Sequence, residues 1–182
     1  MELLQSIRTE YTRYRRLAEL SLEQVADADL DRRIDGDTLG NSIAVTMGHL
    51  IGNLKSRFTD FLTTDGEKPW RQRDREFESP QLDRAGLMAG WNEAWHVVDR
   101  ALDDVAAAGD AVFSQNITIR KVPLTVTDAL LRSVAHVAYH TGQIVYLART
   151  FVGDGWQSPS IPKGQSDAYA KNPTKEKRPD GK

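Results

Sequence analysis

The chain has 182 residues, 40% of them hydrophobic and 27% charged, so we expect one domain with a substantial core. Its formal net charge of -2 gives no reason to expect nucleic acid or an anionic membrane as a partner. Because the sequence contains no cysteine, disulfides, cysteine nucleophiles and cysteine-ligated zinc sites are excluded.

The first two predicted helices follow from apolar residues spaced three and four positions apart. One helix is expected over residues 2–25, and the following residues 27–40, rich in Asp and Gly, are expected to form a loop. A second helix is predicted to begin at Asn41 or Ser42, which are both favourable N-cap residues. The pair Asp65-Gly66 is expected to end it.

Residues 63–81 are charged and show no clear periodicity. Such a segment is long for a connection between helices, so we expect it to cross the domain or to cover the mouth of a site. Ser79 or Asp83 is predicted to cap the third helix, and Gly109 is a natural end for it.

The last third of the chain is expected to contain one more helix and little other regular structure. Residues 111–122 hold short β-prone pieces that predict an extended excursion or a small hairpin. Thr125 or Thr127 is predicted to cap the fourth helix, which should end at Gly153. Residues 175–182 are charged and contain Pro and Gly, so we expect disorder there.

These elements predict an all-α protein. We expect a four-helix bundle over residues 1–153, followed by an irregular, partly disordered C-terminal tail over residues 154–182. No segment has the character of a signal peptide or the length of a membrane span, so a cytoplasmic protein is expected.

The aromatic residues are predicted to belong to the core. Trp91 and Trp95 are four residues apart on the apolar stripe of the third helix, which is typical of a packed helix. For Tyr139 and Tyr146 we also favour the core, over the alternative that a hydroxyl group points into a cavity.

Three of the four histidines have the spacing of a metal site. His136 and His140 are four residues apart and therefore share one face of a helix, and His49 lies on another helix beside its apolar stripe. Three neutral imidazoles leave a bound ion its charge and an open position. The alternative is that these histidines lie at the edge of the core and make ordinary hydrogen bonds. His96 is surrounded by polar positions and is expected to be exposed.

Two polar residues are candidates for supporting the site or binding a cofactor. Asn53 lies one turn after His49 and could fix the tautomer of its ring, and Gln143 could serve either His140 or a bound ligand. Ordinary polarity of a helix surface explains both residues equally well. A metalloprotease is excluded, since Val137 stands where the zinc-protease motif has its catalytic glutamate.

Two of these segments resemble the DinB-like superfamily. The resemblance rests on His49 within Gly48-His49-Leu50 and on residues 136–148 (HVAYHTGQIVYLA), and it extends over nearly the whole chain. The superfamily also includes bacillithiol transferases and mycothiol-dependent isomerases. Residues 161–166 (IPKGQS) are similar to the tail of a small bacterial subgroup described only as a domain of unknown function.

The resemblance implies a bundle with up-down-down-up connectivity, for which residues 63–81 would supply the crossover. It implies a divalent ion, most often zinc or nickel, held by His49, His136 and His140, and it implies a homodimer. Activities in the superfamily include the transfer of a thiol to small electrophiles and isomerisation with a low-molecular-weight thiol. Fold and ligands carry over between relatives better than the reaction does.

Our leading functional expectation is a divalent-metal-dependent enzyme acting on a small-molecule substrate, as a thiol S-transferase with a low-molecular-weight thiol cosubstrate. A metal-dependent hydrolase is an alternative, which is weakened because the sequence offers no clear general base near the histidines. A non-catalytic metal-binding or stress-response module would use the same three histidines. A helical interaction domain with incidental histidines is the remaining alternative.

Overall fold

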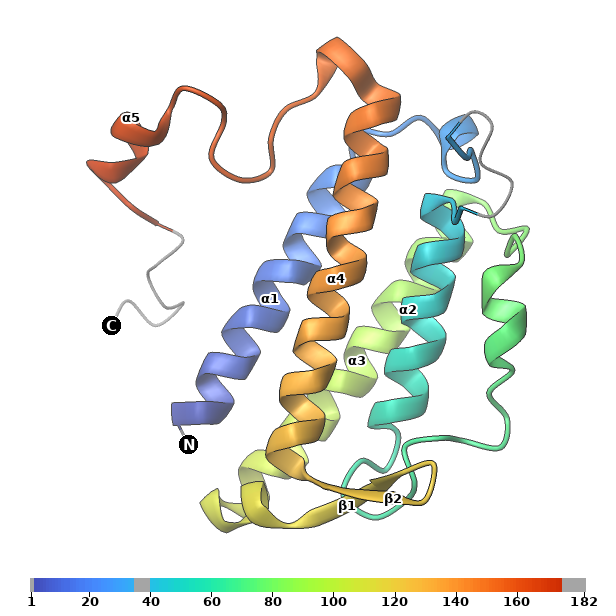
Figure 1. The fold of residues 1–182 in the computed structure, drawn as a ribbon, viewed down its shortest axis with the longest axis vertical. Coiled ribbons are helices and arrows are strands. Elements are labelled where there is room, and N and C mark those ends of the chain that lie inside the picture. Colours follow the sequence, from blue (N-terminus) through green and yellow to red (C-terminus); the bar gives the residue numbers. More distant parts are fainter. Residues whose placement is uncertain (1, 35–39, 175–182) are drawn as a thin grey trace.

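The computed structural model of the protein describes residues 2–34 and 40–174, and it is mostly helical, which confirms the predicted class. Figure 1 shows four long helices side by side: α1 (Glu2–Leu22), α2 (Ile43–Phe58), α3 (Arg84–Ala108) and α4 (Val126–Val152). A small hairpin, one of the two forms expected after the third helix, joins α3 to α4 as two antiparallel strands, β1 (Asn116–Ile119) and β2 (Val122–Thr125).

Side-chain caps determine where three of the helices begin. Ser42, Asp83 and Thr125 each accept a hydrogen bond from the backbone N–H three residues later, at 3.1, 2.8 and 3.0 Å. Each cap is one of the two residues that the sequence offered. The helix α2 ends at Phe58, earlier than predicted, because the chain turns at Asp60, whose φ of 49° lies in the left-handed region.

The apolar stripes of the long helices meet in one core. Trp91 is fully buried and Trp95 nearly so, as predicted. The prediction that Tyr139 and Tyr146 belong to the core is wrong, because each is 64% exposed. Both follow a buried residue of α4 by two positions, and about 200° of helix rotation separates such residues, so the two tyrosines point away from the core.

The segment between α2 and α3 lies along α2 and is partly ordered as a 3-10 helix, η2 (Arg73–Phe77) (Figure 1). Ser56 holds its beginning, since its hydroxyl group donates to the backbone carbonyl of Gly66 at 2.9 Å and accepts from the N–H of Lys68 at 3.2 Å. The segment without periodicity is therefore placed against the helix that carries His49.

The tail after α4 contains a 3-10 helix, η4 (Gly153–Gly155), and a short helix, α5 (Ser166–Ala170), so it is less irregular than predicted. Two hydrogen bonds of 2.8 and 2.9 Å between Gln24 and Gln157 hold its first part to the end of α1. The predicted disorder over residues 175–182 and part of the predicted loop over residues 27–40 lie outside the described residues. None of the described helices combines the length and the apolar character that crossing a membrane requires.

Candidate metal centre

Three histidines from two helices meet beside η2. His49 comes from α2, and His136 and His140 come from α4. The Nε2 atom of His136 lies 3.2 Å from Nε2 of His49 and 3.1 Å from Nε2 of His140, and the three ligand atoms all lie within 4.8 Å of one another. The three histidines that the sequence singled out thus form one group that could hold a metal ion, and His96 is exposed on α3, as expected.

The separations between these nitrogen atoms fit coordination of one ion. Imidazole nitrogens bind zinc at about 2.0–2.1 Å, which places two ligands of a tetrahedral ion about 3.3 Å apart. The distances of 3.1 and 3.2 Å around His136 Nε2 are close to this value. The third pair, Nε2 of His49 and of His140, lies within 4.8 Å, and a common cation would draw these two rings closer together.

The hydrogen bonds on the far side of two rings decide where their protons are. The Nδ1 atom of His49 lies 2.9 Å from Oε2 of Glu76, and Nδ1 of His140 lies 2.7 Å from Oε1 of Gln143. Because both oxygens accept, each Nδ1 donates, and each neutral ring then has a lone pair on Nε2. Both lone pairs face His136 Nε2, which has at most one proton to donate. A cation that accepts all three lone pairs satisfies the three Nε2 atoms, whereas hydrogen bonds among the rings do not. The Nδ1 atom of His136 has no hydrogen-bond partner among the residues that the structure describes.

The surroundings also keep two of the rings, those of His136 and His140, neutral. Burial lowers the pKa of His136 to about 3, and the neighbouring His140 and His49 add to this effect. Burial likewise lowers the pKa of His140, although the hydrogen bond with Gln143 opposes the shift. At neutral pH both rings are therefore in the unprotonated form that a metal requires.

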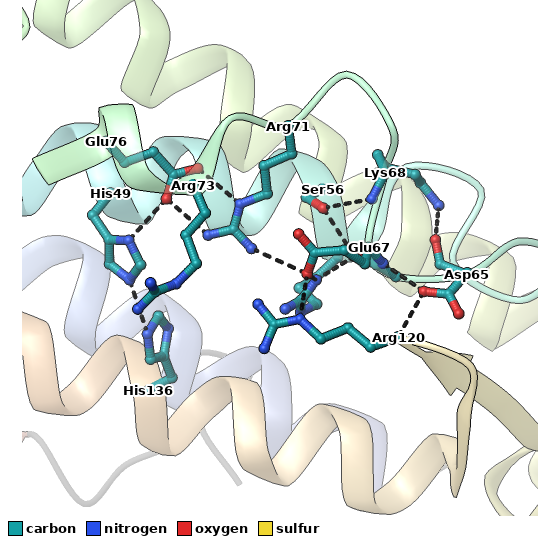
Figure 2. Close-up of polar contacts among 12 residues, drawn as sticks. His49, Ser56, Asp65, Glu67, Lys68, Arg71, Arg73, Glu76, Arg120 and His136 are labelled. Atoms are coloured by element: carbon teal, nitrogen blue, oxygen red, sulfur yellow. Dashed lines mark hydrogen bonds and ion pairs between the residues drawn. The ribbon is translucent and has the colours of Figure 1, made fainter.

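Glu76, from η2, supports His49 in a way that the sequence analysis missed (Figure 2). Its carboxylate also binds Arg71 through two hydrogen bonds, of 2.7 Å from Nε and 2.8 Å from Nη2. Burial alone would raise the pKa of Glu76, but the hydrogen bonds from Arg71 and His49 hold it below its usual range. Glu76 is thus an ionised acceptor that orients the ring of His49. Phe77 stacks on the same ring, with the centroids 4.9 Å apart.

Gly52 makes room for this carboxylate. A Cβ atom at this position of α2 would lie 2.7 Å from Cδ of Glu76 and closer still to Oε1, so a larger residue would displace the carboxylate. A glycine three residues after a candidate ligand was the one feature of the sequence that could have indicated a close neighbour here. It could not show which residue fills the space.

The two predicted supporting residues have different positions. Gln143 contacts His140, one of the two roles considered for it. Asn53 does not provide the partner of His49 Nδ1, since Glu76 takes that position, but it lines the adjoining pocket. Both remain candidates for contact with a bound ligand.

A pocket of about 470 Å³ opens beside the histidines, and His49 and His136 form part of its wall. Its size is in the usual range for small-molecule sites. It contains both charged and apolar side chains, contributed by α2, the segment before α3, the hairpin and α4. A small molecule bound there would lie next to the point on which the ring nitrogens converge.

Comparison with known proteins adds a family but no activity. No curated protein and no solved structure matches the chain. A family model described as "Protein of unknown function (DUF1572)" matches residues 1–165, which include the four long helices and all three histidines. The chain therefore belongs to the DUF1572 family of proteins of unknown function.

Proposed function

We propose that this protein is a divalent-metal-dependent enzyme that transfers a thiol to a small electrophilic substrate. One observation carries the proposal: the Nε2 lone pairs of His49 and His140 converge on Nε2 of His136 at the wall of a pocket of about 470 Å³. Three neutral protein ligands leave a coordination position free, which distinguishes catalytic from closed structural sites. We propose His49, His136 and His140 as the ligands, and zinc or nickel as the ion.

The remaining residues have roles that suit this chemistry. A bound divalent ion with a free position would stabilise the thiolate form of a thiol at neutral pH. Glu76 and Gln143 hold two rings in the tautomer that presents Nε2, and Phe77 covers one face of His49. The chain has no cysteine, so the thiol would be brought by a low-molecular-weight cosubstrate.

The environment of Glu76 favours thiol transfer over hydrolysis. A hydrolase needs a general base near the ion, and Glu76 is the carboxylate in contact with the histidines. Both its oxygens are bound by Arg71 and one also by His49, and its pKa lies below the usual range. An ionised carboxylate held in this way is a weak base, so it serves to orient His49.

We also propose a DinB-like bundle with up-down-down-up connectivity over residues 1–153. Its support is that α1 packs mainly against α4, and α2 against α3 and α4. The long connection before α3 runs along α2 in Figure 1, as a crossover between parallel neighbours must.

A homodimer is the assembly that we propose, and the outer face of α4 supports it. Tyr139 and Tyr146 are seven residues apart on this helix, each 64% exposed, and Leu131 is 50% exposed. We expect sedimentation velocity to give a dimer for the full chain and a monomer after Tyr139→Ser with Tyr146→Ser. A monomeric full chain would contradict this assembly.

The function is tested by turnover of a model electrophile, such as 1-chloro-2,4-dinitrobenzene, with a panel of thiols. The protein is loaded with zinc or nickel and compared with His136→Ala and with His96→Ala, an exposed histidine outside the site. We expect the His136 variant to lose at least about tenfold in rate and in bound metal, and the His96 variant to keep both. Equal rates in all three proteins would end the catalytic proposal. Metal bound by the wild type without any turnover would instead indicate a non-catalytic metal-binding or stress-response module.

A further inference from the structure

We infer that the pocket beside the three histidines binds the oxyanion, a carboxylate or phosphate group, of a small amphipathic molecule. That this molecule is a substrate rests on the proposed function, whereas the binding of the anion rests on the pocket alone. Among the described residues, no Asp or Glu lines the pocket. Five arginines from four different parts of the chain line it: Arg57, Arg71, Arg73, Arg120 and Arg132.

Arg71 provides the most specific feature. Its side chain is only 2% exposed, and Nε and Nη2 are bound to Glu76. Its Nη1 atom is buried and has no hydrogen-bond partner among the described residues, and Oε2 of Glu67 is 3.9 Å away. A buried guanidinium N–H without an acceptor is costly. An oxyanion in the pocket that Arg71 lines would supply this acceptor.

The neighbouring arginines share one carboxylate. Oε2 of Glu67 accepts from Nη1 of Arg57 at 3.1 Å and from Nε of Arg120 at 3.0 Å, and it is also the nearest acid to Nη1 of Arg71 (Figure 2). Burial lowers the pKa of Arg57, and repulsion from Arg71 and Arg120 adds to the shift while Glu67 opposes it. Glu67 and Glu76, which binds Arg71, together offer two carboxylates to three guanidinium groups, which leaves one positive charge uncompensated at the wall of the pocket.

Two further arginines of the pocket wall take no part in this network with Glu67 and Glu76. Arg132, on α4, is exposed and makes no ion pair within the described part of the chain. Arg73 lies over the ring of Phe77 at 4.9 Å, and its ion pair at 3.7 Å is with Asp74, which is fully exposed. If the arginines served only to hold the hairpin against α2 through Glu67, Arg57 and Arg120 would be sufficient. Arg73 and Arg132 would not be needed.

One side of the pocket wall is apolar, which defines the ligand further. Side chains from the end of α2, the chain after it and the hairpin provide this surface: Phe58, Phe61, Ile119, Val122 and Leu124. Planar guanidinium groups match carboxylate and phosphate oxygens with two parallel hydrogen bonds. The pocket therefore suits a molecule with an oxyanion at the arginines and a short apolar part facing the hairpin.

The test uses isothermal titration calorimetry with matched probes on the full chain, both metal-loaded and chelator-treated. The probes are succinate, its neutral counterpart succinamide, and inorganic phosphate. We expect succinate to bind at least about tenfold more tightly than succinamide, because charge-assisted hydrogen bonds are lost in the diamide. Tighter binding of phosphate than of succinate would identify the phosphate group as the preferred oxyanion. We expect Arg132→Gln to weaken succinate binding several-fold, and Arg16→Gln, an exposed arginine of α1 outside this pocket, to leave it unchanged.

Equal affinity for succinate and succinamide would overturn the inference. So would equal succinate affinity in wild type, Arg132→Gln and a second pocket variant, Arg120→Gln. Succinate binding that survives chelation, in a protein without thiol transfer, would support the anion pocket and contradict the proposed enzyme. Metal-dependent turnover without discrimination between the two probes would support the enzyme and contradict the pocket.

Discussion

Replacing Glu76 by Gln tests whether the carboxylate on the far side of His49 controls metal binding. The substitution keeps the size of the side chain and removes the charge that accepts from His49 Nδ1 at 2.9 Å. Partners that orient metal-ligating histidines typically contribute 10- to 100-fold in affinity. That range corresponds to about 1.4–2.7 kcal/mol. We expect the upper half of it, because Glu76 is only 11% exposed and solvent screens the interaction little.

The measurement is a competition titration for zinc against a fluorescent chelator at pH 7. Glu67→Gln is the matched control, because Glu67 binds the same group of arginines and, within residues 2–34 and 40–174, makes no hydrogen bond or ion pair with a histidine. We expect Glu76→Gln to weaken zinc binding at least about thirtyfold and Glu67→Gln to change it less than about threefold. The Glu76→Gln substitution also removes the charged partner of buried Arg71, which should cost about 1–3 kcal/mol of fold stability. Urea unfolding of the metal-free proteins measures this loss separately from the loss of zinc affinity.

Two results would refute this reasoning. Unchanged zinc affinity in a cooperatively folded Glu76→Gln protein would show that the carboxylate does not orient His49. An equal loss in Glu67→Gln would show that the arginine network acts on the site as a whole, without a specific role for the hydrogen bond between Glu76 and His49.

Four further substitutions have clear expected outcomes. Gly52→Ala should weaken zinc binding in the same titration, because its Cβ would displace Glu76, whereas Gly48→Ala on the same helix has open space and should stabilise the protein by about 0.5–1 kcal/mol in urea unfolding. Gly52→Ala with unchanged affinity would contradict the predicted overlap. Asp65→Asn should destabilise the fold at pH 7, since the Asp65 carboxylate accepts from three backbone N–H groups, which hold its pKa below the ordinary 3.8 although burial raises it. Because folding lowers the pKa of Asp65, its ionised carboxylate stabilises the fold at pH values above the unfolded pKa of 3.8. The difference in unfolding free energy between wild type and Asp65→Asn should therefore shrink as the pH falls below 3.8. A difference that stays constant with pH would contradict this prediction. Trp91→Ala should cost about 3–5 kcal/mol in urea unfolding, because Trp91 is fully buried, and a loss below about 1 kcal/mol would argue against its place in the core.

Much of the fold could be predicted because the features involved are local. Apolar residues three and four apart identify a helix wherever it packs, and a cap such as Ser42 needs only a backbone N–H three residues away. The same holds for His136 and His140, since residues four apart on a helix face one another whatever surrounds them. The grouping of His49 with this pair went beyond any local pattern, because it required two helices to meet.

The error over Tyr139 and Tyr146 has a physical cause as well. Each tyrosine has an apolar ring and a polar hydroxyl group, so composition does not decide between core and surface. The direction of the side chain depends on which face of α4 the other helices cover. That face is occupied by Val137 and Ile144, both fully buried.

The sequence by itself determined the approximate helical segments, two candidate caps for each of three helices and the pair of histidines one turn apart, because each depends on residues within a few positions of one another. Only the tertiary structure decided that Glu76 and Arg71 lie behind His49, and that five arginines line the pocket beside it. These residues belong to segments whose spacing carries no periodic pattern, or to elements far apart in the chain. Their convergence depends on where the connection after α2 comes to rest, which long-range packing determines and no local pattern encodes.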